Sequence, residues 1–221
     1  MIDLNCDLGE GCSNDAALFP LIHSANIACG GHAGSPTIML QSLQLAKQHG
    51  VRVGAHPGYM DREHFGRREL TIPADNLLAD CVYQIAALEA LARHCRFRLA
   101  YIKPHGALYN QAQRDSNIAT VLIEVAQFFG LPLMGLPQSA LAKAAQQAGV
   151  GYLAEGFADR KYLPNGQLVP RSEPNAMITD PIEAAQQVKH LQTMGQVETI
   201  CVHGDQPNVI TFLTRLRELL T

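Results

Sequence analysis

Residues suited to proton transfer and charge stabilisation recur at the ends of short apolar segments. Asp7 lies near the end of the first such segment, His56 follows the third, and Lys103 with His105 follows the fourth. Histidine and carboxylate side chains exchange protons with substrates, whereas an ammonium group stabilises developing negative charge. The candidate catalytic residues are therefore Asp7, His56, Lys103, His105, His203 and Asp205.

A second set of polar residues is suited to holding a small substrate. Arg160 and Arg171 lie in the segment 155–180, which is long and rich in proline, glycine and charge. Long segments of this kind often cover a site, and the planar arginine side chain binds carboxylate or phosphate oxygens in pairs. We expect this segment to act as a lid. The predicted substrate-binding residues are Asn5, Glu10, His32, Arg160 and Arg171.

These residues are spaced by alternating strand-length and helix-length segments. The predicted strands are 2–8, 25–29, 51–55, 99–102, 132–136, 150–154 and 199–202. The predicted helices are 36–49, 75–94, 117–129, 139–148, 181–194 and about 209–220. Alternating units of this kind predict a parallel sheet covered by helices. We expect one α/β domain over residues 1–221, an incomplete TIM-like (β/α) barrel of about seven parallel strands, with an open doubly wound sheet as the alternative.

The barrel prediction explains why the polar residues follow the strands. The carboxyl ends of parallel barrel strands meet at one mouth, where this architecture carries its chemistry. Side chains alternate along a strand, so Asn5 and Asp7 share one face while Leu4, Cys6 and Leu8 take the other. The polar face is predicted to point into the barrel.

Simpler roles remain open for several of these residues. For Asn26 and Asp159, a purely structural role as a turn-former or helix cap is as consistent with the sequence as a place in the site. A further set of histidines on predicted helix faces is expected at the surface: His49, His94 and His190. The default prediction is that no metal is bound. As an alternative, Asp7, His32 and His56 have residue types that suit a one-carboxylate, two-histidine metal site.

Composition narrows the class of partner. The formal net charge is −3 and the sequence pI about 6.3, which disfavours binding to nucleic acid or to an anionic membrane. The first residues lack a basic stretch followed by a long apolar one, so we expect a cytoplasmic protein. The six cysteines form no C-x-x-C pair, so neither a zinc knuckle nor a thioredoxin-like motif is expected. No G-x-x-x-x-G-K-[ST] run is present, so ATP is not expected to bind here in a P-loop.

Several long motifs resemble the LamB/YcsF family, the A subunits of prokaryotic 5-oxoprolinase. They run in order from Ile2 to Asp205 and are DLNCDLGEG, SANIACGGHAG, GAHPGYMDREHFGR, KPHGALYNQA, EGFADRKYLPNGQLVPRS and CVHGD. The resemblance implies a barrel related to the glycoside hydrolase/deacetylase superfamily. It also implies ATP-coupled opening of 5-oxo-L-proline to L-glutamate, with subunits B and C as partners.

A mechanism for that reaction follows as a hypothesis. The partner subunits would phosphorylate the lactam, and this chain would position the activated ring and open it. Asp7 with His56 or His105 would serve as base and orienting pair, and Lys103 would stabilise negative charge. His203 and Asp205 would manage a second proton transfer. Two alternatives are a metal-dependent deacetylase-like hydrolase and a non-catalytic substrate-binding component.

Three features depart from the family pattern. Gly31 stands where a phenylalanine is usual, and Ser35 stands where an aspartate is common. The stretch 195–199 is shorter than the usual approach to the last strand. The first two departures predict a change in pocket shape or in the anchoring of the loop that contains them.

Overall fold

Parallel strands form a closed ring in the computed structural model, which describes residues 2–171, 173–206 and 208–221. β7 pairs with β1 and so completes the barrel. The strands are β1 (Asp3–Leu8), β2 (Ser24–Ala28), β3 (Arg52–His56), β4 (Tyr101–Ile102), β5 (Leu133–Gly135), β6 (Tyr152–Phe157) and β7 (Thr199–Cys201). The predicted α/β barrel of seven parallel strands is confirmed, and the open-sheet alternative is wrong.

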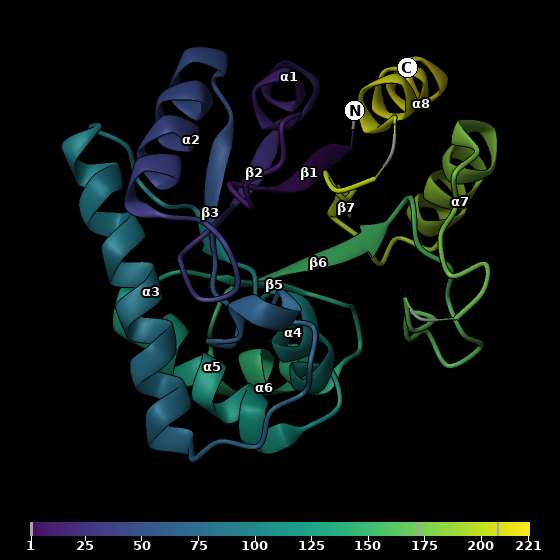
Figure 1. The fold of residues 1–221 in the computed structure, drawn as a ribbon. Coiled ribbons are helices and arrows are strands. Elements are labelled where there is room, and N and C mark those ends of the chain that lie inside the picture. Colours follow the sequence, from purple (N-terminus) through teal and green to yellow (C-terminus); the bar gives the residue numbers. More distant parts are fainter. Residues whose placement is uncertain (1, 172, 207) are drawn as a thin grey trace.

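Helices surround the ring of strands (Figure 1). They are α1 (Asp15–Leu18), α2 (Pro36–His49), α3 (Ala74–His94), α4 (Gly106–Ala112), α5 (Ser116–Phe129), α6 (Ala140–Ala148), α7 (Pro181–Thr193) and α8 (Val209–Leu220). Two short 3₁₀ turns are η1 (Phe19–Leu21) and η2 (Arg62–His64). In the described part of the chain, no helix is both long enough and apolar enough to cross a membrane.

Local sequence signals set the ends of several helices. The Ser35 hydroxyl accepts a hydrogen bond from the Ile38 backbone N–H at 3.3 Å, and Pro36 begins α2. The Asp180 carboxylate caps α7 in the same way through the Ile182 N–H. Gly50 ends α2 with a left-handed φ of 67°, which glycine adopts at low cost. Ser35 therefore supplies the cap at the start of α2.

Two short helices, α1 and α4, were not predicted, and α4 is the one that follows a predicted site residue. It begins at Gly106, directly after the predicted site residue His105, and is only seven residues long. His105 precedes the helix without forming a side-chain capping bond, so the usual start signal is missing. The helix nevertheless buries Leu108 and Tyr109, which shows that tertiary packing rather than a local cap holds it.

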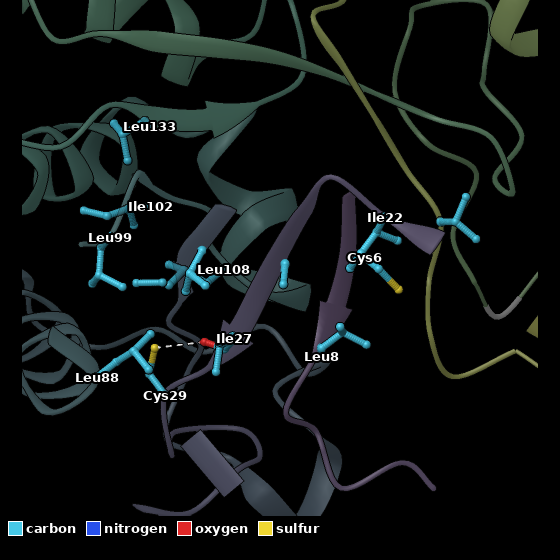
Figure 2. Close-up of a cluster of buried hydrophobic side chains, with 14 of the residues drawn as sticks. Cys6, Leu8, Ile22, Ile27, Cys29, Leu88, Leu99, Ile102, Leu108 and Leu133 are labelled. Atoms are coloured by element: carbon cyan, nitrogen blue, oxygen red, sulfur yellow. Dashed lines mark hydrogen bonds between the residues drawn. The ribbon is translucent and has the colours of Figure 1, made fainter. Parts of the chain in front are cut away.

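The main hydrophobic core lies between the barrel and the helices. The outward side chains of β1, which are Leu4, Cys6 and Leu8, are at most 1% exposed and belong to this core. Figure 2 shows part of it, with Leu88 of α3 and Ile27 of β2 near the Cys29 thiol, which donates to the Ile27 carbonyl at 3.2 Å. Since the apolar side chains point outward, the inner face of β1 is left to Asn5 and Asp7.

Candidate active site

A buried ion cluster lies inside the barrel near its carboxyl-terminal end. Lys103, which directly follows β4, places Nζ 2.9 Å from Asp7 Oδ1 and 2.7 Å from Glu155 Oε1. All three side chains are at least 92% buried. Burial opposes charge on Lys103, but Asp7, Cys201 and Glu155 outweigh it and keep the lysine pKa well above its usual range. Burial likewise opposes charge on Asp7, yet Lys103 and His56 hold its pKa well below the usual value. Lys103 and Asp7 are therefore charged at neutral pH.

A layer of amides beneath this cluster fixes its geometry. The Asn26 amide donates to Asn5 Oδ1 and to Asp7 Oδ1, both at 2.8 Å. The Tyr101 hydroxyl donates to Asn26 Oδ1 at 2.7 Å, and the Asn5 amide donates to Thr199 Oγ1 at 2.8 Å. Asn26 therefore supports Asp7 from within β2 and does not cap a helix. Asn5 lies one layer below Asp7, beside the ion cluster.

Three imidazoles and a carboxylate gather next to Asp7. Glu10 Oε1 is 3.0 Å from His32 Nε2 and 3.2 Å from His105 Nδ1. The rings of His32 and His105 stack with centroids 3.5 Å apart, and His56 meets both rings edge-on. The His56 Nε2 atom also lies 3.5 Å from Asp7 Oδ2, which links this cluster to the ion cluster.

The protonation of these groups follows from their surroundings. Burial lowers the pKa of His32 to about 3 and also lowers the pKa of His105. Both rings are therefore neutral near pH 7, and each keeps one unprotonated nitrogen. Burial also opposes charge on His56, but Asp7 outweighs this effect and raises its pKa. His105 and His32 hold the pKa of Glu10 below its usual value despite burial.

His203 is oriented by Asp159 rather than by Asp205. Its Nδ1 atom lies 2.9 Å from Asp159 Oδ2, and its backbone N–H donates to the same carboxylate at 2.8 Å. Asp159 is fully buried and also accepts a hydrogen bond from Gln206. Burial opposes charge on Asp159, but His203 outweighs it and lowers the Asp159 pKa. The role of Asp159 is therefore to orient an imidazole at the end of β7.

Asp205 lies at the rim and pairs with arginines. Its Oδ2 atom is 2.8 Å from Arg171 Nη1 and 2.5 Å from Arg67 Nη2. Arg171 belongs to the predicted lid, and Arg67 belongs to the loop after β3. Asp205 thus joins the loop after β3 to the segment after β6.

These groups surround a cavity of about 610 Å³ at the barrel mouth. Its lining includes the lid residues Arg160, Leu163, Leu168 and Arg171. Within the lid, antiparallel β-bridges pair Arg160 with Met177 and Tyr162 with Leu168. The buried Arg160 side chain donates from Nη2 to the Val169 carbonyl at 2.6 Å. The segment 155–180 accordingly forms one wall of the cavity.

The structure brings most of the predicted site residues to this cavity. It is lined by Asp7, Glu10, His56, Lys103, His105, Arg160, Arg171, His203 and Asp205, whereas the buried Asn5 and His32 lie behind that surface. Sequence reasoning did not select Glu155, and it left Asp159 as a possible cap. Both lie near the carboxyl end of β6. They therefore fit the same pattern of polar residues at strand ends that pointed to the other site residues.

The residues that could hold a metal differ from the predicted alternative set. His32 and His56 lie together, but the four side chains that offer mutually close ligand atoms are Glu10, His32, His56 and His105. In this set Glu10 and His105 take the place of Asp7. A second close group is formed by Asp7, Cys201 and His203, but Lys103 Nζ already contacts both Asp7 and Cys201 at 2.9 and 3.2 Å.

Two similar proteins illustrate what this chain resembles, and each is covered over nearly its whole length. One, named as the A subunit of 5-oxoprolinase, comes from Neisseria meningitidis (serogroup A, strain Z2491). It is 45% identical over 233 residues, covering 99% of this chain and 95% of that protein. The other is the crystal structure of a lactam utilization protein from Thermus thermophilus. It has a TM-score of 0.91 and 40% identity, over 99% of this chain and 95% of that chain.

A more distant likeness concerns the fold alone. A family 4 carbohydrate esterase from Streptomyces lividans, in complex with acetate, has a TM-score of 0.52 at 14% identity, over 99% of this chain and 86% of that chain. The match to the LamB/YcsF family covers residues 2–221. The chain therefore belongs to the LamB/YcsF family.

Proposed function

We propose that this chain is the A component of an ATP-dependent 5-oxoprolinase and opens 5-oxo-L-proline to L-glutamate. The main support is the buried contact between Lys103 and Asp7 at the floor of the cavity, 2.9 Å apart, with the neutral His105 beside it. That arrangement sets a positive charge and a base within one enclosed volume. The names of the related proteins, the A subunit of 5-oxoprolinase and a lactam utilization protein, agree with this activity.

The proposed chemistry uses ATP to activate a stable amide. The lactam oxygen takes the γ-phosphoryl group of ATP, and ADP leaves. Water then adds to the ring carbon, the carbon–nitrogen bond breaks, and the nitrogen takes a proton to become the amine of glutamate. The remaining acyl phosphate is hydrolysed by a second water molecule, which yields glutamate and phosphate.

Each step has a candidate residue in this chain. Asp7, which Lys103 and His56 keep ionised despite its burial, accepts the proton of the attacking water. Lys103 stabilises negative charge on the oxygens, and Asp7 orients Lys103 and His56. His203, oriented by Asp159, donates the proton that the departing nitrogen requires. In this proposal Asp159, rather than Asp205, is the partner of His203 in the second proton transfer.

The substrate is an anion, and the rim of the cavity carries arginines. Arg160 lines the cavity from the lid, and Arg171 lies beside it. A guanidinium group binds carboxylate or phosphate oxygens through paired N–H donors. In the proposal Arg160 binds the substrate carboxylate or the transferred phosphoryl group, while Arg171 holds the lid to Asp205.

The proposal places ATP binding largely outside this chain. The sequence has no P-loop run, so subunits B and C would bind ATP and phosphorylate the lactam. The complex would act in the cytoplasm, where ATP is available.

Reconstitution tests this proposal. Production of glutamate from 5-oxoproline and ATP should require this chain together with subunits B and C, and each part alone should be inactive. If B with C alone supports full turnover, this chain is not required for the reaction and the proposal is wrong. If this chain alone turns over 5-oxoproline with ATP at the rate of the full complex, the division of labour proposed here is wrong.

A further inference from the structure

One ligand atom from each of four side chains lies within 4.8 Å of the other three at the cavity wall. The four, here called the histidine–glutamate cluster, are Glu10, His32, His56 and His105, and each is at least 94% buried. Glu10 Oε1 lies 3.0 Å from His32 Nε2, 3.2 Å from His105 Nδ1 and 3.9 Å from His56 Nε2. His56 Nε2 and His105 Nδ1 are 3.1 Å apart.

Two of the imidazoles are held by backbone carbonyls on their outer nitrogens. His56 Nδ1 lies 2.7 Å from the Lys103 carbonyl oxygen, and His105 Nε2 lies 2.9 Å from the Phe65 carbonyl oxygen. A carbonyl oxygen can only accept, so both outer nitrogens carry hydrogen. In the neutral rings the inner nitrogens are then lone-pair acceptors that face each other and Glu10. A carbonyl partner on the outer nitrogen is the usual companion of a metal-binding histidine.

Such a gathering of acceptors requires a positive charge at its centre. A proton on one ring relieves the repulsion between lone pairs at chiefly one contact, because an N–H group donates in a single direction. An ion between the four atoms contacts all of them at once. Ligand atoms bound about 2.0–2.2 Å from a tetrahedral zinc ion lie roughly 3.3–3.6 Å apart. The four separations given above, between 3.0 and 3.9 Å, bracket that range.

Glycines keep the space that the imidazoles need. A Cβ atom at Gly58 would lie 2.7 Å from His32 Nδ1, and one at Gly66 would lie 2.7 Å from the His32 Cβ atom. His32 is therefore confined against His105, on which it stacks at 3.5 Å. Ligands held in this way lose little conformational freedom when an ion binds, which favours binding.

The charge around the cluster also favours a cation. Asp7 and Glu155 lie in the adjacent ion cluster, and with Glu10 they make three carboxyl groups against the single ammonium of Lys103. Imidazole nitrogens together with one carboxylate form the ligand set that suits zinc and its neighbours in the first transition row. We propose that the histidine–glutamate cluster binds one divalent metal ion of the zinc class through Glu10, His32, His56 and His105.

Metal binding can be measured without substrate, ATP or partner subunits, so the outcome does not depend on the proposed lactam reaction. Untagged protein is stripped with a chelator and titrated with Co²⁺, whose visible absorption is strong when four ligands surround it tetrahedrally. Zn²⁺ is then added to displace Co²⁺, and bound metal is quantified by mass spectrometry. We expect saturation at about one ion per chain and a higher melting temperature with Zn²⁺.

Two variants and a control locate the ion. Glu10→Gln keeps the shape of the side chain and removes its charge, whereas His105→Ala removes a ligand. Each should weaken Co²⁺ binding by at least about 100-fold, since loss of even an outer-shell partner costs about 10–100-fold. His190→Ala removes an exposed histidine from α7 and should bind like the parent. Circular dichroism checks that each variant is folded.

The outcomes separate cleanly. Tetrahedral Co²⁺ absorption that is lost in folded Glu10→Gln protein supports the site. The proposal is overturned if the parent protein takes up no stoichiometric Co²⁺ or Zn²⁺, in which case a proton occupies the cluster. It is also overturned if both cluster variants bind as tightly as the parent, because the metal then lies elsewhere.

Discussion

A Cβ atom added to Gly31 would lie 2.3 Å from Oε1 of the Gln84 side chain. Gln84 comes from α3, is fully buried, and holds the loop after β3 through the backbone N–H and carbonyl of Gly58 at 3.0 and 2.8 Å. The space beside Gly31 is thus filled by a glutamine that anchors the loop next to His32.

Gly31→Ala should therefore destabilise the protein. The new methyl group forces Gln84 to move, and we expect a loss of about 1–3 kcal/mol in the free energy of unfolding, typical of an overpacked core. Urea unfolding of Gly31→Ala, Gln84→Ala and the double variant measures this. The double variant should lose less than the sum of the single losses, because the clash disappears with the Gln84 side chain. Strict additivity would show that the two positions do not interact.

Lys103→Met should be strongly destabilising. It leaves Asp7 and Glu155 buried without their ammonium partner, and breaking a buried ion pair from one side costs about 3–5 kcal/mol. Chemical denaturation gives the value. Lys189→Met on the exposed face of α7 is the matched control and should change stability little. Equal stability of the two variants would mean that the ion cluster contributes nothing to folding.

Asp7→Asn and His105→Ala should each lower glutamate production by the reconstituted complex by about 10²–10⁴-fold, the scale for losing an acid or base in the reaction. Both residues line the cavity. His190→Ala on α7 should retain activity. Steady-state rates of glutamate production by complexes with each of the three variants test this prediction. Similar rates for all three would show that the reaction does not take place at the mouth of the barrel.

Asp159→Asn should reduce the pH dependence of stability at acid pH. The pKa of Asp159 is lowered in the folded protein, where burial is outweighed by His203. Its contribution to stability is therefore complete above the unfolded pKa of about 4 and is lost as pH falls through the lower folded pKa. Urea midpoints from neutral to acid pH should fall less steeply for Asp159→Asn than for the parent. Identical acid slopes in the two proteins would contradict this assignment.

Arg160→Lys should weaken substrate binding although it preserves charge. Lysine cannot offer the paired N–H donors of the guanidinium group, so KM for 5-oxoproline in the complex should rise by about tenfold or more. Lys161→Met is the control, because Lys161 lies in the same segment but pairs with Glu183 at the surface. An unchanged KM in Arg160→Lys would show that Arg160 does not bind the substrate and that the lid is only a structural loop.

The sequence alone determined the order of strands and helices and the end of the barrel that carries polar groups. Those properties depend on local signals, such as the alternation of Asn5 and Asp7 with Leu4 and Cys6, or the cap at Ser35. Such signals act over a few residues, so they can be read without knowing the fold. The short helices α1 and α4 were not predicted, because neither begins with a side-chain cap.

Only the tertiary structure decided which polar residues meet. His203 bonds Asp159, forty-four positions away, although Asp205 is its near neighbour in sequence. Glu10, rather than Asp7, joins the three histidines, because the loop after β1 turns at Gly9 and Gly11 with positive φ and brings Glu10 across the mouth. Partners of this kind depend on barrel closure and on loop conformation, which place side chains from distant segments within a few ångströms of one another.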